Sequence, residues 1–386
     1  MSEFFDPRFA DTGLEEQTTG ELDLEARSGL RRVAGLSTEL QDVTEVEYRQ
    51  LRLEKVVLIG VWTDGDFDQT QRSLAELAQL AETAGSQVLD VLVQRRDRPD
   101  PATYIGSGKL QELHQIVMAT GADTVICNGE LSPSQLSKME KVVKVKVIDR
   151  TWLILDIFAQ HARSREGKAQ VSLAQMQYML PRLRGWGDAL SRQSGGIGTR
   201  GPGETKLESD RRRIGKSMSK LRREIKEMGV ARTTQRAQRR RSNVPSVAIA
   251  GYTNAGKSSL LNRLTGAGVL VEDSLFATLD PTVRKSHTPS GRSITLSDTV
   301  GFVRHLPHQL IDAFKSTLEE VSDSDLIVHV VDGSDPDPLE QFNSVREVLE
   351  EIKANNIPEI IPSCSPLFSR LSSVFPKVGV SGLEQM

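Results

Sequence analysis

The chain has 386 residues, of which 38% are hydrophobic and 26% charged, and this balance predicts two or three soluble domains with apolar cores. Its two cysteines, Cys127 and Cys364, lie far apart, which excludes a disulfide framework or a cysteine-rich metal site. The acidic start and the absence of an apolar run of membrane-spanning length favour a cytoplasmic protein without a membrane segment.

Charge is distributed unevenly around the net value of −3. Residues 1–25 hold eight acidic side chains and one Arg, whereas residues 200–241 hold fifteen Lys and Arg against five acids. The basic block favours nucleic acid as a partner, with a solvated helix face as the alternative. The acidic first segment, residues 1–45, is rich in turn residues and is predicted to be mostly disordered.

Residues 46–160 are predicted to form a small α/β domain. The apolar run at 56–61 predicts a buried strand, and residues 73–85 place Leu74, Leu77 and Leu80 on one helical face. Strands at 88–94 and 123–128, with a helix at 109–121 between them, continue an alternation that implies parallel pairing. Within this domain, TYIGSGK at 103–109 is either a strand-to-helix turn or a glycine-rich anion loop.

Residues 161–243 are predicted to form a basic helical hairpin. Residues 167–180 have a helical pattern, and residues 207–229 space apolar side chains at sevens, fours and threes, which is typical of a coiled-coil seam. The seam comprises Leu207, Ile214, Met218, Leu221, Ile225 and Met228. A Gly/Arg-rich loop at 184–204 lies between the helices, and a basic linker at 237–243 follows them. Because Gly permits close approach and Arg pairs with phosphate, this loop is predicted to contact RNA; a flexible linker is the alternative.

The stretch VPSVAIAGYTNAGKSSLLNRL, residues 244–264, is the most specific motif in the chain. A strand leads into Gly251, four variable residues and then Gly256, Lys257 and Ser258 at the start of a helix. Backbone N–H groups in such a loop surround a β-phosphate at the positive end of the helix dipole. Lys257 is predicted to bridge phosphate oxygens and Ser258 to bind Mg²⁺.

Two later segments fit the same nucleotide-binding domain. SITLSDTVGF, residues 293–302, delivers Asp298 at the end of a strand and Gly301 shortly after it, so Asp298 is expected in the Mg²⁺ shell and the Gly301 N–H near the γ-phosphate. FATLDPTV, residues 276–283, offers two threonines that could reach the ion, with Thr278 as first choice and Thr282 as the alternative.

These motifs, together with GIGTRGPGETKLESDRRRI upstream of them, resemble the HflX family of ribosome-associated GTPases over residues 50–361. The resemblance implies an α/β fold with a small N-terminal subdomain, a coiled-coil hairpin whose glycine loop enters the large ribosomal subunit, and a Ras-like GTPase domain at 244–361. It also implies GTP as substrate, Mg²⁺ as cofactor, large-subunit rRNA as partner, and a role in splitting or rescuing stalled ribosomes under stress. Asn254 resembles an Asn through which some related GTPases hold K⁺. A monomer is the expected state.

The predicted site residues fall into four groups. The nucleotide-binding residues are Gly251, Tyr252, Thr253, Asn254, Ala255, Gly256, Lys257, Ser258, Phe276, Ala277, Thr278, Leu279, Asp280, Asp298, Thr299, Val300 and Gly301. Among these, Lys257, Thr278 and Gly301 are assigned to catalysis, and Ser258, Thr278 and Asp298 to the metal. The RNA-binding residues are Arg192, Arg200, Lys206, Arg211, Arg212 and Arg213.

The sequence departs from the family pattern after Ile361. The resemblance predicts an Asn-Lys-x-Asp guanine-binding motif there, but Pro362, Ser363, Cys364 and Ser365 follow instead, and residues 362–386 form an atypical Pro/Ser-rich tail. The GTPase domain is therefore expected to be C-terminally incomplete. Two alternative functions remain open: an ATPase or unselective nucleotide hydrolase, and a ribosome- or RNA-binding module with impaired turnover.

Overall fold

The structure is a computed structural model that describes residues 54–63, 67–182, 202–241, 244–266, 275–288, 290–304, 310 and 315–362. Side chains are described throughout these ranges except at 202–207, 231–233, 235–241 and 315–317. The predicted disordered segment at 1–45, residues 184–201 of the Gly/Arg-rich loop and the tail from 363 lie outside the described residues. No helix within these ranges is both long enough and apolar enough to cross a membrane.

The N-terminal unit is a parallel four-stranded sheet with strand order β2-β1-β3-β4. Its strands are β1 (Lys55–Trp62), β2 (Gln87–Arg95), β3 (Thr124–Cys127) and β4 (Lys146–Asp149). The connecting helices are α3 (Phe67–Thr83), α4 (Ser107–Thr120) and α5 (Pro133–Val143), and α6 (Arg150–His161) follows β4. This arrangement confirms the predicted parallel α/β fold, and it adds β4, α5 and α6, which were not predicted.

Alternating residues of β1 separate the two faces of this sheet. Val56 and Leu58 pack with residues of α3 and α6, whereas Val57 and Ile59 pack with residues of α4 and α5. All four side chains are fully buried, as expected for a central parallel strand covered on both faces. TYIGSGK forms a turn into α4, where the Gly106 N–H donates to Gln94 Oε1 at 2.8 Å.

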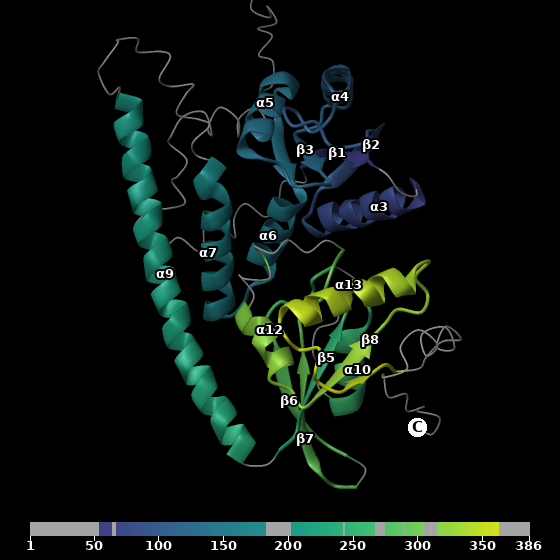
Figure 1. The fold of residues 1–386 in the computed structure, drawn as a ribbon, viewed down its shortest axis with the longest axis vertical. Coiled ribbons are helices and arrows are strands. Elements are labelled where there is room, and N and C mark those ends of the chain that lie inside the picture. Colours follow the sequence, from purple (N-terminus) through teal and green to yellow (C-terminus); the bar gives the residue numbers. More distant parts are fainter. Residues whose placement is uncertain are drawn as a thin grey trace, which may run out of the picture.

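Two helices form the predicted basic hairpin. α7 (Arg165–Arg182) packs along α9 (Pro202–Arg241), a helix of 40 residues that runs along one side of the molecule (Figure 1). Ile214 and Met218 of α9 are buried against Leu173, Met176 and Leu180 of α7. Helix α9 is longer than predicted: residues 202–204, expected in the loop, and residues 237–241, expected in the linker, are both helical.

The phosphate-loop unit is a five-stranded sheet with strand order β6-β7-β5-β8-β9. Its strands are β5 (Ser246–Gly251), β6 (Thr282–His287), β7 (Ser293–Asp298), β8 (Leu326–Val330) and β9 (Glu359–Ile360). β6 is antiparallel to β7, and all other pairs are parallel. Helix α10 (Lys257–Thr265) packs on one face, and α12 (Lys315–Ser322) and α13 (Pro338–Glu351) pack on the other.

Candidate nucleotide and magnesium site

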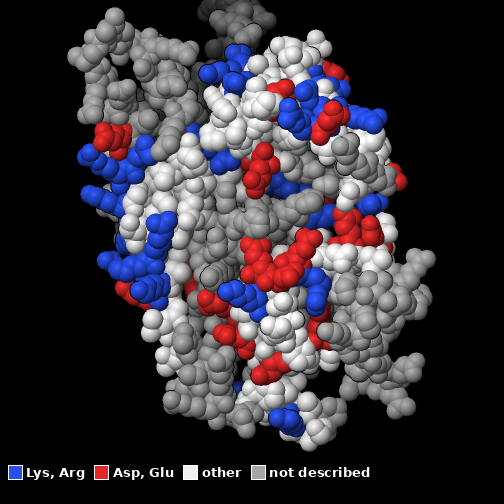
Figure 2. Space-filling view, viewed as in Figure 1, with Lys and Arg blue, Asp and Glu red and all other residues white. Residues whose placement is uncertain are grey.

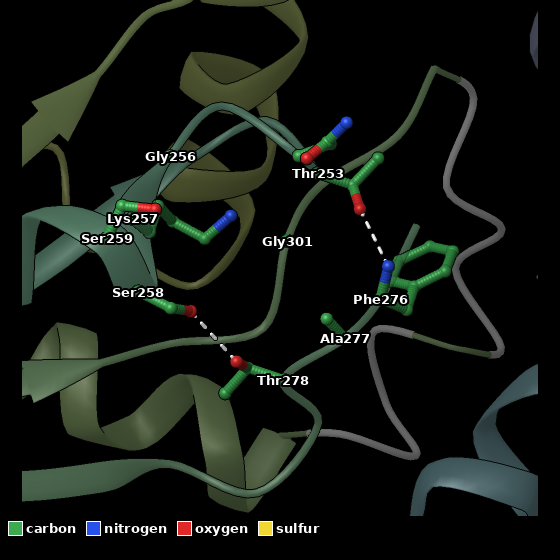
Figure 3. Close-up of a pocket in the computed structure, with 10 residues that line it drawn as sticks. Thr253, Gly256, Lys257, Ser258, Ser259, Phe276, Ala277, Thr278 and Gly301 are labelled. Carbon is green, nitrogen blue, oxygen red and sulfur yellow. Dashed lines mark hydrogen bonds between the residues drawn. The ribbon is translucent and has the colours of Figure 1, made fainter. Parts of the chain in front are cut away.

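The loop between β5 and α10 has the geometry of a phosphate-binding loop. Gly256 occupies the left-handed region with φ of 87° and directly precedes Lys257, the first residue of α10. A side chain there would be strained, which accounts for glycine at this position. Thr253, Asn254, Gly256, Lys257, Ser258, Ser259, Phe276, Ala277, Thr278 and Gly301 line a pocket beside this loop (Figure 3). The helix N-terminus therefore opens into the pocket, where its N–H groups favour an anion.

Lys257 is held at the base of this pocket. Its side chain is 6% exposed, and its Nζ donates to the Tyr252 carbonyl oxygen at 2.7 Å. Burial lowers the pKa of Lys257 to about 8, with the nearby Asp298 carboxylate acting in the opposite direction. The ammonium is thus still mostly charged at neutral pH and lies beside the loop that would receive phosphate.

Three oxygen-bearing side chains from three different segments meet next to Lys257. Ser258 Oγ donates to Asp298 Oδ2 at 2.5 Å. Ser258 Oγ and Thr278 Oγ1 are 3.0 Å apart (Figure 3). Asp298 is fully buried, and its Oδ1 is a buried atom without a hydrogen-bond partner among the described residues. Burial raises the pKa of Asp298, although the hydrogen bond from Ser258 opposes this.

This oxygen cluster fits Mg²⁺. The ion prefers hard oxygen ligands and is commonly bound by one or two carboxylates with hydroxyl and phosphate oxygens. A cation would satisfy the orphaned Asp298 Oδ1 and would also remove the cost of burying the carboxylate. The structure therefore brings together Ser258, Thr278 and Asp298, the three predicted metal ligands. Thr282, the alternative to Thr278, lies instead in β6, where it pairs with Asp298 in the strand register.

The segment after Asp298 is tied directly to the phosphate loop. The Thr253 N–H donates to the Phe302 carbonyl at 2.7 Å, and the Phe302 N–H donates to the Gly251 carbonyl at 3.2 Å. A Cβ at Gly301 would stand 2.6 Å from Thr253 Cα, so only glycine fits between the two segments. Phe302 is fully buried, and its side chain has no polar atom with which to orient a water molecule.

Several predicted nucleotide-binding residues have side chains that point elsewhere. Leu279 and Val300 are buried in the apolar core, and Thr299 Oγ1 donates to the Ile249 carbonyl at 2.7 Å. Tyr252 points toward α3, and Asp280 contacts the segment before α7. These residues position the loops that carry them. Ser259, which follows Ser258 in the motif, lines the pocket but was not predicted.

A buried charged cluster joins the phosphate-loop unit to the N-terminal unit. We call Glu76, Arg150, Tyr252 and Arg304 the junction cluster; these residues are between 3% and 8% exposed. Glu76 Oε1 accepts from Tyr252 Oη at 2.7 Å and lies 3.0 Å from Arg150 Nη2. Arg150 Nη2 also donates to the Arg304 carbonyl at 3.1 Å, and the Arg304 N–H donates to Tyr252 Oη at 2.7 Å. The phosphate loop and the Gly301 segment thus share one carboxylate of α3.

The predicted RNA-binding residues are only partly described. Arg212 and Arg213 are exposed on α9, and Arg212 pairs with Glu208 at 2.8 Å on the surface. Arg211 is half-buried, the side chain of Lys206 is not described, and Arg192 and Arg200 lie outside the described residues. Lys216, Lys220 and Arg223 add exposed basic side chains to the same helix. Figure 2 shows this basic strip along the edge of the molecule that α9 forms.

Models of three protein families match consecutive parts of the chain. They describe a GTP-binding GTPase N-terminal region at residues 71–159, a GTP-binding GTPase middle region at 161–239 and a 50S ribosome-binding GTPase at 246–363. The boundary between the first two lies in the last turn of α6.

Curated relatives are similar over most of the chain. A GTPase HflX from Caldanaerobacter subterraneus subsp. tengcongensis is 52% identical over 307 residues, which is 80% of this chain and 71% of that protein. The GTPase HflX of Alkalihalophilus pseudofirmus is 49% identical, covering 82% of this chain and 74% of that protein. The GTPase HflX of Escherichia coli is 45% identical, covering 80% of this chain and 72% of that protein.

Proposed function

Because the chain belongs to the HflX family of GTPases, we propose that it binds the large ribosomal subunit and couples GTP binding and hydrolysis to ribosome splitting or rescue under stress. It would act in the cytoplasm, as a monomer. The observation that carries the proposal is that one chain joins a phosphate-loop pocket, beside which Ser258 contacts Asp298, to a helix of 40 residues with exposed Lys and Arg. The phosphate site supplies nucleotide chemistry, and the basic strip supplies contacts to nucleic acid.

The residues of the phosphate site have separate roles in this proposal. Lys257 would exchange its contact with the Tyr252 carbonyl for phosphate oxygens, and the N–H groups at the start of α10 would surround the β-phosphate. Ser258, Thr278 and Asp298 would hold Mg²⁺, which when bound neutralises charge that develops on the phosphates. The Gly301 N–H would contact the γ-phosphate, and water would be the attacking nucleophile.

Turnover by the protein alone is expected to be slow. Many GTPases place a water-orienting Gln after the glycine that corresponds to Gly301, whereas this chain has Phe302 there, buried in the core. Because the Phe302 side chain cannot orient a water molecule, hydrolysis would depend on the ribosome to position the nucleophile.

The basic strip can be tested through the salt dependence of binding. Replacing Arg211, Arg212 and Arg213 with Ala is expected to weaken binding to large ribosomal subunits and to lower the slope of log K against log salt by about 0.7–0.9 for each lost phosphate contact. The measurement is a binding titration at several salt concentrations, with GTP, GDP or no nucleotide present.

A matched control removes the same charge elsewhere. Arg284, Lys285 and Arg292 are exposed on the β6–β7 hairpin, and their replacement with Ala should leave the slope closer to that of the wild type. Equal slopes for the wild type and the α9 variant would refute a role for these arginines. Binding that is indifferent to nucleotide would favour an RNA-binding module with impaired turnover.

A further inference from the structure

Residues 276–280, which we call the Thr278 segment, end at Asp280. The Asp280 carboxylate contacts the residues directly before α7, the first helix of the hairpin. Asp280 Oδ2 accepts from the backbone N–H groups of Arg163 and Ser164 at 3.0 and 2.7 Å, and Ser164 Oγ donates to Asp280 Oδ1. Ser164 Oγ in turn accepts from the Gly167 N–H at 2.9 Å. The carboxylate thus satisfies the N–H groups of the two residues that precede α7, while Ser164 Oγ caps the first turn of that helix. The carboxylate also lies at the positive end of α7.

The other end of the same segment is fixed at the metal site. Thr278, two residues before Asp280, lies 3.0 Å from Ser258 Oγ. Leu279, between them, is 2% exposed in the core. The side chain of Phe276 contacts Phe158 of α6 edge-to-face, with ring centroids 4.6 Å apart. A short, well-packed segment therefore spans from the predicted Mg²⁺ ligands to the connection between α6 and α7.

Gly167 shows how closely Asp280 approaches α7. A Cβ on Gly167 would stand 2.5 Å from Asp280 Oδ1 and 3.0 Å from Ser164 Oγ. Even an added methyl group would therefore push the carboxylate away. Gly167 is far from the phosphate pocket in sequence and is not among the residues that line it.

We propose that Asp280 is a positioning residue that anchors Thr278 to the start of α7, so that GTP in the phosphate site and the placement of the α7–α9 pair favour one another. GTP differs from GDP in the γ-phosphate, which together with Mg²⁺ orders the segments around it. If the ordered form of the Thr278 segment is also the form that holds α7, then GTP binding favours one placement of the α7–α9 pair. By reciprocity, that placement raises the affinity for GTP by the same factor. The inference has two halves: an effect on nucleotide binding, and an effect on binding to ribosomal RNA. The RNA half rests on the proposed function, and the nucleotide half does not.

The nucleotide half is tested by separate affinities for two probes. Asp280→Ala, Ser164→Ala and Gly167→Ala are each measured with a fluorescent, non-hydrolysable GTP analogue and with fluorescent GDP, both in Mg²⁺. Loss of charge-assisted hydrogen bonds in Asp280→Ala should weaken binding of the GTP analogue about tenfold, with GDP changed less than twofold. Ser164→Ala and Gly167→Ala should also lower the ratio of the affinity for the GTP analogue to the affinity for GDP. Asp280→Asn, which keeps one acceptor oxygen, should lower this ratio less.

The matched control for the glycine variant is Gly108→Ala in α4. A Cβ at Gly108 meets no atom within 4 Å, so this substitution should leave the affinities for both probes unchanged. Equal losses for the two probes in the Asp280 and Gly167 variants would show a merely structural role and would overturn the proposal. Unchanged affinities for both probes would overturn it as well.

The RNA half is tested on large ribosomal subunits with the same variants. The wild type should bind more tightly with the GTP analogue than with GDP, and Asp280→Ala and Gly167→Ala should bring that ratio close to one. Failure of the wild type to bind the subunits at all would refute the proposed function and with it the RNA half, while the nucleotide ratios would still decide the role of Asp280. If all variants keep the wild-type ratio of subunit affinities with the GTP analogue and with GDP, the proposed link to α7 would be overturned.

Discussion

Replacing Glu76 with Ala is expected to destabilise the protein strongly and to loosen the nucleotide site. Glu76 lies on α3 in the N-terminal unit, yet its Oε1 accepts from Tyr252 Oη at 2.7 Å and lies 3.0 Å from Arg150 Nη2. Arg304 packs beside it, with its Nε 3.9 Å from Glu76 Oε2. These partners are almost completely buried, so the loss of the carboxylate leaves the Arg150 guanidinium and the Tyr252 phenol without their common acceptor, while Arg304 keeps its ion pair with Glu340.

The size of the effect follows from this burial. Removing one member of a buried ion pair costs about 3–5 kcal/mol, because the remaining charge is uncompensated. We therefore expect Glu76→Ala to lower the free energy of unfolding by about 4 kcal/mol. Glu76→Gln keeps the shape and one acceptor and should cost about 2 kcal/mol, the scale of a hydrogen bond to a charged group. The double variant Glu76→Ala, Arg150→Ala should cost less than the sum of the single variants by about 1–3 kcal/mol.

Urea unfolding monitored by circular dichroism gives these free energies. Glu82→Ala is the control, since Glu82 is exposed on the same helix and its replacement should change stability by less than about 0.5 kcal/mol. The affinity for GDP should also fall in the Glu76 variants, because Tyr252 belongs to the phosphate loop. A Glu76→Ala cost close to that of Glu82→Ala, or strict additivity with Arg150→Ala, would refute the reasoning.

Three further outcomes are expected. If Asn254 holds K⁺, hydrolysis on the ribosome should be faster in K⁺ than in Na⁺ and Asn254→Ala should remove that difference; equal wild-type rates in both salts would contradict it. Burial acts to raise the pKa of Glu359, but the hydrogen bond from His329 and the charge of Arg346 hold the pKa below its ordinary 4.5. Stability from this group is thus present above that value and lost as the pH falls through the lower folded pKa. Acid unfolding of Glu359→Gln should lack this component, and identical acid profiles would exclude it. Because Pro362, Ser363, Cys364 and Ser365 stand where the guanine-binding carboxylate is expected and none of them carries one, GTP and ATP should compete for the site within about tenfold, far from the 10⁴-fold of a specific pocket; a strong preference for GTP would contradict this.

Regular patterns made much of the fold predictable. The buried run of β1, the apolar faces of α3 and α9 and the glycine spacing of the phosphate loop are local signals, and each predicted the type and place of its element, although α3 begins six residues before the predicted helix at 73–85. Strand β4 has only four residues, which is too short for a clear period. Helix α6 is buried over much of its surface and therefore lacks an amphipathic pattern. The ends of α9 were misplaced because Gly203 and a run of arginines resemble a loop or linker by composition.

The candidate site shows the same division. Lys257, Ser258 and Asp298 belong to motifs whose spacing is typical of phosphate and Mg²⁺ binding, so the sequence alone predicts that they lie together, as they do in the structure. Glu76 and Arg150 lie more than a hundred residues upstream of the loop they contact, and neither stands in a motif. Arg304 follows Gly301 closely in GFVR, but only the packing of the two units shows that its backbone and side chain meet α3.

The length of α9 sets the scale of any movement that begins at its base. With 40 residues and a rise of 1.5 Å per residue, the helix is a rod about 60 Å long. A tilt of about 5° at one end would carry the other end about 5 Å, roughly one helical turn. Such a rod converts a rearrangement of about 1 Å, acting about 10 Å from the pivot, which is the usual distance between packed helices, into a displacement about six times larger at the far end. Shortening α9 by whole turns should reduce the displacement of its far end in proportion to the length removed, while the tilt angle at its base stays unchanged.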